Sequence, residues 1–122
     1  MKTCIVLPTY NEKESLPLLC REILAFDMML NMVIVDDASP DGTGVIADSL
    51  AIAHQAIKVI HRSGKLGLGT AYLAGFGAAL ASGATRVLTM DADLSHNPAY
   101  VPEMVALSNK YDVVIGSRYV EG

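Results

Sequence analysis

The sequence predicts an α/β fold in which a mostly parallel sheet is flanked by helices. Short apolar segments rich in β-branched residues alternate along the chain with longer segments of helical pattern, which is typical of parallel strands joined by helical crossovers. Of the 122 residues, 52% are hydrophobic and only 18% are charged, a balance that fits a sheet buried on both faces. We expect residues 1–122 to form a single domain, because this length suffices for one core.

Five segments predict strands, because each is short, apolar and followed by polar residues or glycine. They are Cys4–Leu7, Met32–Val35, Ile57–Ile60, Val87–Met90 and Val113–Ile115. Four helices are expected between them. The first is capped by Asn11, with Glu14 completing a capping box, and runs to about Phe26. The others are Thr43–Ala53, Gly69–Ser82, and a helix that opens at Asn97 and Pro98 and ends near Asn109.

Charge and composition exclude several classes of protein. The net charge of −4 and the lack of clustered Lys and Arg argue against nucleic-acid binding. No apolar segment reaches the roughly 20 residues that span a bilayer, and the N-terminus passes directly into a strand-like segment, so no signal peptide is expected. Cys4 and Cys20 lie in apolar patterns and are interpreted as buried, reduced thiols of a cytoplasmic protein.

The residues that carry chemistry are expected directly after the strands, because ligands of an open parallel sheet bind outside the carboxyl ends of its strands. The unusual polar and glycine residues of the chain are concentrated in these positions. They are Pro8–Glu12, Asp36–Thr43, His61–Gly69, Asp91–Asn97 and Gly116–Gly122.

The triplet Asp91-Ala92-Asp93 is a candidate metal site. Two carboxylates one residue apart at a strand's exit can both approach a hard cation such as Mg²⁺ or Mn²⁺, whose coordination is completed by water and substrate phosphate. A solvated turn with a helix-capping Asp is the alternative for this triplet alone. The apolar strand before it and Ser95-His96-Asn97-Pro98 after it favour the metal site.

Two further segments leave alternatives open. In Asp36–Thr43, Asp37 can accept hydrogen bonds from a nucleobase, but a tight turn at Pro40 and Gly42 explains the pattern equally well, and Asp41 or Thr43 can cap the next helix. In His61–Gly69, the glycines let the backbone approach a phosphate that Arg62 and Lys65 would neutralise. That segment matches neither a Walker loop nor the dinucleotide fingerprint, and a flexible surface loop is its alternative.

Five blocks together resemble the family-2 glycosyltransferases and, within them, the dolichol-phosphate (polyprenol-phosphate) mannosyltransferases. The blocks occur in the order and at the spacing of that family and cover nearly the whole chain. They are Pro8–Glu12, Asp36–Thr43, Leu66–Ala71, Met90–His96 and Gly116–Tyr119.

The resemblance implies a GT-A (Rossmann-like) fold and assigns roles to single residues. Asp91 and Asp93 would hold the metal and act in catalysis; Ser95, where some members have Gln, would assist the metal through a bridging water. Arg118 would face the acceptor phosphate, whereas an exposed loop Arg is its alternative. The residues implied to bind the nucleotide sugar are Pro8, Tyr10, Glu12, Asp36, Asp37, Lys65, Gly67, Asp91 and Ala92.

The implied activity is an inverting, metal-assisted transfer of a hexose, mannose from GDP-mannose, onto a polyprenyl (dolichyl) phosphate at the cytoplasmic face of a membrane. A UDP-sugar donor such as UDP-glucose is the alternative within the family, and a nucleotide-binding module without turnover is the alternative outside it. A phosphatase of the haloacid-dehalogenase type also fits Met90–Ser95 but carries this motif on its first strand. Family members continue beyond Gly122 with acceptor-side and membrane-facing segments, so we expect this chain to bind the donor without completing transfer.

Overall fold

The strands and helices alternate along the chain as the sequence predicts. The computed structural model describes residues 2–26, 29–64, 67–90, 92, 102 and 113–115. The strands are β1 (Thr3–Thr9), β2 (Leu30–Asp36), β3 (Ile57–His61), β4 (Arg86–Thr89) and β5 (Val113–Ile115). The helices are α1 (Ser15–Leu24), α2 (Thr43–Ala53) and α3 (Leu68–Ala81).

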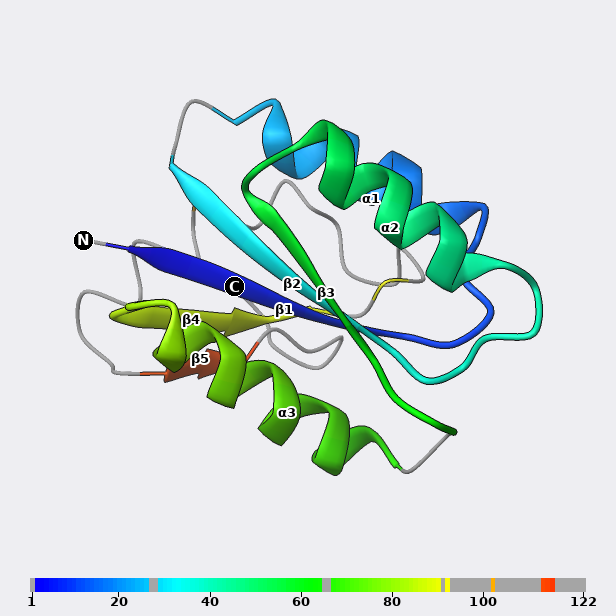
Figure 1. The fold of residues 1–122 in the computed structure, drawn as a ribbon. Coiled ribbons are helices and arrows are strands. Elements are labelled where there is room, and N and C mark those ends of the chain that lie inside the picture. The colour runs from blue at the N-terminus through cyan, green and yellow to red at the C-terminus, as the bar shows by residue number, and fades with distance from the viewer. Residues whose placement is uncertain are drawn as a thin grey trace.

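The five strands form one sheet in the order β3-β2-β1-β4-β5 (Figure 1). Each neighbouring pair is parallel. The first strand of the chain, β1, therefore lies at the centre, with β2 on one side and β4 on the other. The expected parallel sheet is confirmed.

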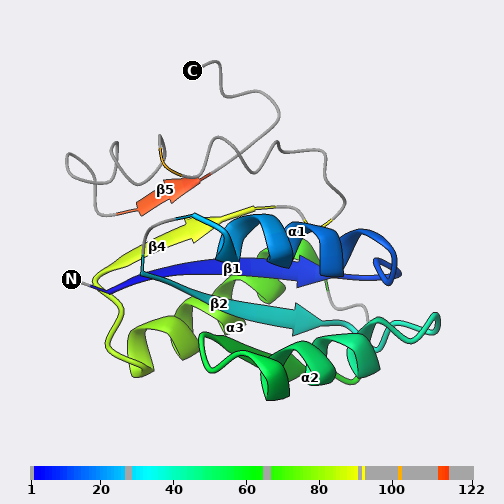
Figure 2. The ribbon, with the colours of Figure 1, turned by 90° about the horizontal axis from the view of Figure 1, so that it is seen from above.

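Helices cover both faces of this sheet. Figures 1 and 2 show α1 and α2 on one face and α3 on the other. Alternate residues of β1 enter the two layers, because successive side chains of a strand point to opposite faces. Ile5 and Leu7 pack with the buried residues of α1, whereas Cys4 and Val6 pack with those of α3. All four side chains are at most 1% exposed, so the sheet is buried on both sides where β1 crosses it.

Helix α3 approaches β1 very closely. Its sequence, LGTAYLAGFGAALA, has no charged residue and many small ones. A Cβ placed on Gly75 would lie 2.3 Å from Cγ1 of Val6, closer than any real side chain tolerates. A Cβ placed on Gly77, two residues further along the helix, would have no atom within 4 Å. The glycine at position 75 therefore sets how near the helix axis lies to the sheet.

The observed ends of the helices refine the prediction. Helix α2 has the expected bounds, and α3 differs from its expected bounds by one residue at each end. The prediction that Asn11 caps α1 is wrong, because α1 begins at Ser15 and no side chain caps it. Asn11 has a φ of +57°, a left-handed backbone conformation that makes a turn before the helix. The helix expected from Asn97 to Asn109 lies outside the described residues.

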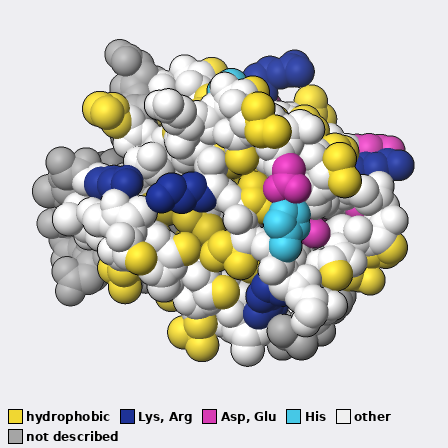
Figure 3. Space-filling model, viewed as in Figure 1, with side chains coloured by type: hydrophobic (Ala, Val, Ile, Leu, Met, Phe, Trp, Pro, Cys, Tyr) yellow, Lys and Arg dark blue, Asp and Glu magenta, His cyan; other side chains and the backbone are white. Residues whose placement is uncertain are grey.

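The surface carries no extended basic area on the face that Figure 3 shows, where described Lys and Arg side chains stand singly or in pairs among apolar ones. Within the described part of the chain, no helix has the length and apolar character needed to cross a membrane.

Candidate functional site

The strand order creates a switch point at the carboxyl ends of β1 and β4. From β1 the chain moves outward through β2 to β3, then returns to the other side of β1 to add β4 and β5. The connections that leave β1 and β4 therefore run to opposite sides, and the space between their carboxyl ends is the usual ligand crevice of such a sheet. The residues that follow these two strands include Tyr10, Glu12 and Ala92.

The loop after β1 is held in place by side chains of the loop after β2. The backbone N–H groups of residues 11, 12 and 13 donate to Ser39 Oγ, Thr43 Oγ1 and Asp41 Oδ2 at 3.0, 2.9 and 3.2 Å. Asp41 also accepts hydrogen bonds from the backbone and hydroxyl of Thr43, and these bonds lower the pKa of its carboxyl. The expectation that Asp41 or Thr43 caps the second helix is wrong, because the cap residue of α2 is Gly42 and no side-chain hydrogen bond caps the helix. Asp41 instead joins the turn before α2 to the loop after β1.

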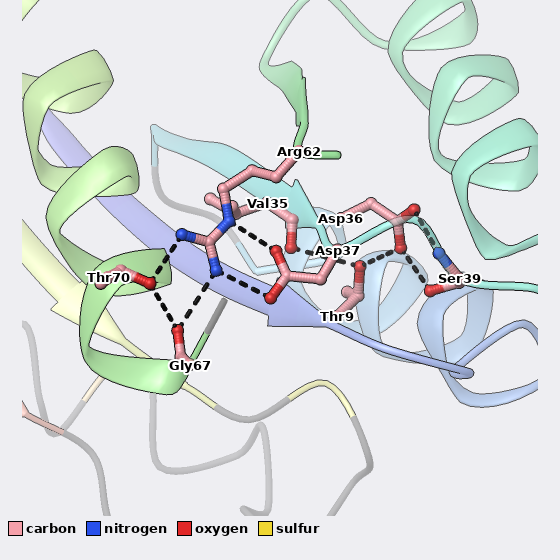
Figure 4. Close-up of polar contacts among 8 residues, drawn as sticks. All are labelled: Thr9, Val35, Asp36, Asp37, Ser39, Arg62, Gly67 and Thr70. Atoms are coloured by element: carbon pink, nitrogen blue, oxygen red, sulfur yellow. Dashed lines mark hydrogen bonds and ion pairs between the residues drawn. The ribbon is translucent and has the colours of Figure 1, made fainter. Parts of the chain in front are cut away.

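Asp36, the last residue of β2, is buried with 2% of its surface exposed. Its Oδ1 accepts hydrogen bonds from Thr9 Oγ1 at 2.8 Å and from Ser39 Oγ at 2.6 Å, and its Oδ2 accepts one from the backbone N–H of Ser39 at 3.2 Å (Figure 4). These bonds join the end of β1 to the loop after β2. The carboxylate therefore gives this loop its shape.

Asp37 forms a bidentate ion pair with Arg62, the residue after β3 (Figure 4). The Nε and Nη2 groups of Arg62 donate to the two carboxylate oxygens at 2.6 and 2.8 Å, and both side chains are about one-tenth exposed, at 9% and 10%. Arg62 also donates to Thr70 Oγ1 at 2.8 Å and to the carbonyl of Gly67 at 3.2 Å. The Asp37 carboxylate raises the pKa of the Arg62 guanidinium. The sequence analysis considered Arg62 as a phosphate ligand. In the structure its guanidinium connects the ends of β2 and β3 to the start of α3.

The loops after β1 and β4 meet at Ser15. Its Oγ lies 2.8 Å from Oε2 of Glu12 and 2.7 Å from the backbone oxygen of Ala92. Ala92 is buried and is the middle residue of the acidic triplet. A pocket of about 380 Å³ lies beside this contact, lined by residues 11–15 and Asp41. The structure therefore brings together Glu12 and Ala92, two of the residues expected to bind a nucleotide sugar, because both contact the hydroxyl of Ser15.

The remaining expected site residues fall into two groups. Pro8 pairs with Val35 near the end of β1, Tyr10 follows that strand and is 37% exposed, and Gly67 precedes α3 with a φ of +104°. Outside the described residues lie Lys65, Asp91, Asp93, Ser95 and Arg118. Among the residues that the structure describes, no group of three or more His, Cys, Asp or Glu side chains is arranged to hold a metal ion.

Sequence reasoning missed the roles of Ser15, Ser39 and Arg62. The contact of Arg62 with Asp37 follows from the observed register, in which Asp36 pairs with His61, so that the next residues along the two chains are neighbours. The sequence alone does not show that register. Ser15 and Ser39 act through contacts between segments far apart in the chain, which no local pattern shows.

The sheet order and the helical layers on both faces define a doubly wound α/β protein with polar residues at its switch point. The chain belongs to glycosyl transferase family 2, whose sequence profile matches residues 4–122. This membership confirms the family resemblance and removes the haloacid-dehalogenase interpretation of Met90–Ser95.

Three mannosyltransferases and related synthases are similar in sequence to essentially the whole of this chain. A polyprenol monophosphomannose synthase from Mycolicibacterium smegmatis is 45% identical over 99% of this chain and 46% of its own length. An undecaprenyl-phosphate mannosyltransferase from Micrococcus luteus is 44% identical over all of this chain and 50% of its own length. A dolichol-phosphate mannosyltransferase from Pyrococcus furiosus is 43% identical, with 34% of its length covered. The chain thus spans about half the length of these relatives or less.

Solved structures confirm the expected GT-A fold. The mannosyltransferase PcManGT from Pyrobaculum calidifontis, in complex with GDP-Man and Mn²⁺, superposes with a TM-score of 0.63 at 26% identity, over 75% of this chain and 27% of that one. TarS 1–349 from S. aureus, in complex with UDP-GlcNAc, superposes with a TM-score of 0.71 over 91% of this chain and 32% of that one. At 23% identity, the second likeness concerns the fold alone.

Proposed function

We propose that this chain is the donor-binding part of a glycosyltransferase that moves a hexose, mannose from GDP-mannose, onto a polyprenyl phosphate with inversion. The observation that carries the proposal is the meeting of the β1 and β4 loops at the switch point, through Ser15, Glu12 and Ala92. The names of the relatives support mannose and a polyprenyl phosphate, and the complex of PcManGT supports GDP-mannose. Since such an acceptor resides in a membrane, we place the reaction at a membrane surface, the cytoplasmic one.

The nucleobase is proposed to bind at Asp37. Each of its carboxylate oxygens has two acceptor positions and uses one for Arg62, so the others can accept N–H groups from a base. Arg62 holds the carboxylate in one orientation, which lowers the entropic cost of recognising the base. Pro8, Tyr10, Glu12, Asp36, Lys65 and Gly67 complete the proposed nucleotide pocket.

The divalent cation, Mg²⁺ or Mn²⁺, is proposed to bind at Asp91, Asp93 and Ser95. The oxygen donors of these side chains suit a hard cation, and the residue between the two acids, Ala92, is anchored beside the crevice by Ser15. When bound, the cation supplies charge that stabilises the leaving diphosphate. Arg118 is proposed to face the acceptor phosphate, which has a second pKa of about 6 and needs little general-base help.

A UDP-sugar donor is the alternative within the family, because the described residues offer base acceptors without distinguishing purine from pyrimidine. A nucleotide-binding module without turnover is the alternative that the transfer assay tests.

A thermal-shift panel tests donor binding. GDP, UDP, GDP-mannose and UDP-glucose are each added with Mn²⁺ or with EDTA, and we expect GDP and GDP-mannose to raise the melting temperature with Mn²⁺ only. A ligand at 100 times its Kd stabilises the native state by about 2.7 kcal/mol, which such a scan resolves. Asp93→Asn should abolish most of the shift, whereas Glu22→Gln, on the exposed side of α1, should leave it unchanged. Equal stabilisation in EDTA would contradict the metal site, and a shift with UDP alone would establish the alternative donor.

A transfer assay tests the acceptor side. Radiolabelled GDP-mannose, Mn²⁺ and a short-chain polyprenyl phosphate are incubated with residues 1–122 and with a version extended to the length of the relatives. We expect mannolipid from the extended version only, and Arg118→Ala in that version should reduce transfer while leaving GDP affinity nearly unchanged. A comparable loss of GDP affinity would place Arg118 in the nucleotide site instead.

A further inference from the structure

We propose that Thr43 is a positioning residue for the nucleotide and that it acts through Glu12. This inference rests on the proposed function and adds to it a role for a hydroxyl that does not cap the helix in which it lies. Thr43 is the first residue of α2 and is buried, with 0% of its surface exposed. It can therefore influence a ligand only through the residues that it contacts.

The hydroxyl of Thr43 is oriented by two contacts. It donates its single proton to Oδ1 of Asp41, and its oxygen accepts the backbone N–H of Glu12 at 2.9 Å. The directions of these bonds are fixed, because a backbone N–H only donates and a carboxylate only accepts. The other carboxylate oxygen of Asp41 accepts the backbone N–H of Lys13 at 3.2 Å. Thr43 and Asp41 therefore hold two consecutive amides of the loop after β1.

Glu12 is held at three points. Its N–H is bound by Thr43, its backbone oxygen accepts the N–H of Leu16 at 2.9 Å, and Oε2 of its side chain lies 2.8 Å from Oγ of Ser15. Within the described part of the chain, these contacts use Oε2 and leave Oε1 of the same carboxylate to a ligand. Glu12 also lines the pocket of about 380 Å³ beside this loop.

A carboxylate that is already held in one orientation binds a ligand hydroxyl or N–H at a lower entropic cost. Without the Thr43 hydroxyl, the N–H of Glu12 loses its partner, and the carboxylate occupies its binding orientation in a smaller fraction of the molecules. The apparent affinity for a ligand falls in proportion to that fraction. Removing the hydroxyl should therefore weaken nucleotide binding by about three- to tenfold, the effect of one neutral hydrogen bond.

Substitutions at position 43 separate the hydroxyl from the shape of the side chain. Thr43→Val has nearly the same volume without the hydroxyl, and Thr43→Ser keeps the hydroxyl. The Kd of GDP is measured by isothermal titration calorimetry with Mn²⁺, or that of UDP if the unchanged protein prefers it. Thr43→Val should raise the Kd by the factor given above, and Thr43→Ser should match the unchanged protein. Ile23→Val, in the buried face of α1, is the control, because it lowers stability without touching the loop and should leave the Kd unchanged.

A cycle of single and double variants shows whether Thr43 acts through Glu12. In a chain that already carries Glu12→Ala, Thr43→Val should leave the Kd unchanged, because the carboxylate that it positions is absent. A purely structural role would weaken binding by the same factor in both backgrounds. If Glu12→Ala binds too weakly to be titrated, Glu12→Gln takes its place, and the factor must then be smaller than in the unchanged background.

Three results would overturn the proposal: an unchanged Kd in Thr43→Val, a Thr43→Ser variant as impaired as Thr43→Val, or the same loss in both Glu12 backgrounds. If Thr43→Val does not fold, Asp41→Ala removes the acceptor that orients the hydroxyl, at a partly exposed position. Asp41→Ala should weaken GDP binding only while Glu12 is present, and an unchanged Kd there would equally overturn the proposal. Failure of the proposed function is distinguishable, because then the unchanged protein itself binds neither GDP nor UDP.

Discussion

Replacing Arg62 by alanine is expected to lower the free energy of unfolding by about 3 kcal/mol. The substitution removes the partner of the Asp37 carboxylate, whose side chain is 9% exposed, and two bonds at 2.6 and 2.8 Å are lost with it. Breaking a buried ion pair by removing one partner costs about 3–5 kcal/mol, because the remaining charge stays buried without compensation. The low end applies here, since the exposed tenth of each side chain admits some water.

Urea denaturation of a double-mutant cycle measures this coupling. The cycle combines Arg62→Ala with Asp37→Ala, and the double variant should recover about 2 kcal/mol relative to the sum of the single ones, because it leaves no unpaired charge. Arg62→Lys should restore only part of the stability, since an ammonium group cannot make two parallel bonds to a carboxylate. Arg21→Ala, on the exposed face of α1, is the matched control and should cost less than about 1 kcal/mol. A loss below 1 kcal/mol for Arg62→Ala, or a coupling energy near zero, would refute the assignment of this pair as the tie between β2 and β3.

Three further predictions follow from packing and ionisation. Gly75→Ala should destabilise the protein by about 1–3 kcal/mol, because its methyl group would overlap the side chain of Val6 in β1. Gly77→Ala, whose methyl group meets no atom within 4 Å, should stabilise it by up to about 1 kcal/mol. Thermal unfolding of the two variants measures the difference, and equal stabilities would contradict the close contact of α3 with β1. The pKa of Asp41 is lowered in the folded state, so the stabilising contribution of its carboxylate is present above the ordinary aspartate pKa of about 3.9. This contribution is lost as the pH falls through the lower pKa of the folded state. Asp41→Asn should therefore make the free energy of unfolding depend less on pH at the acid end, and an equally steep dependence would contradict the prediction. Burial raises the pKa of Cys4 to about 11 and of Cys20 to about 12. Neither thiol should therefore react with a disulfide reagent at pH 8 until urea unfolds the chain. Rapid reaction of the folded protein would contradict the burial of these thiols.

The strands were predictable from the sequence because a sheet buried on both faces requires continuous apolar segments, and each such segment of the chain became a strand. Their ends extend beyond the apolar run where polar residues still pair: β1 continues through Pro8 to Thr9, and β3 includes His61, because their neighbours in β2 continue to Asp36. A pattern of hydrophobicity contains no information on such pairing. The start of α1 was predicted wrongly for a related reason. Asparagine is a common helix-capping residue, but the backbone of Asn11 forms a turn in which its N–H donates to Ser39 Oγ.

The candidate site was predictable as a set of positions and not as a set of contacts. The rule that ligands bind at the carboxyl ends of parallel strands selected Glu12, Asp36, Asp37 and Ala92, and these residues do lie at that edge. What each carboxylate contacts depends on strand order, which local sequence does not determine. The partnership of Asp37 with Arg62 exists because β2 and β3 are neighbours, and the contact of Ser15 with Ala92 exists because β1 and β4 are neighbours.

The central place of β1 has a consequence for the order in which the site can assemble during synthesis. Thr3 pairs with Leu30 on one side and with Arg86 on the other, so the second pairing must wait for a much longer stretch of chain. The proposed nucleobase side needs nothing beyond Thr70, whereas the metal side needs Ala92. Contacts between distant segments form slowly because a long loop must close before they stabilise anything. A nascent chain can therefore present the nucleobase half of its crevice while β1 still has an open edge where β4 belongs, and that edge is the one most in need of protection until synthesis has passed it.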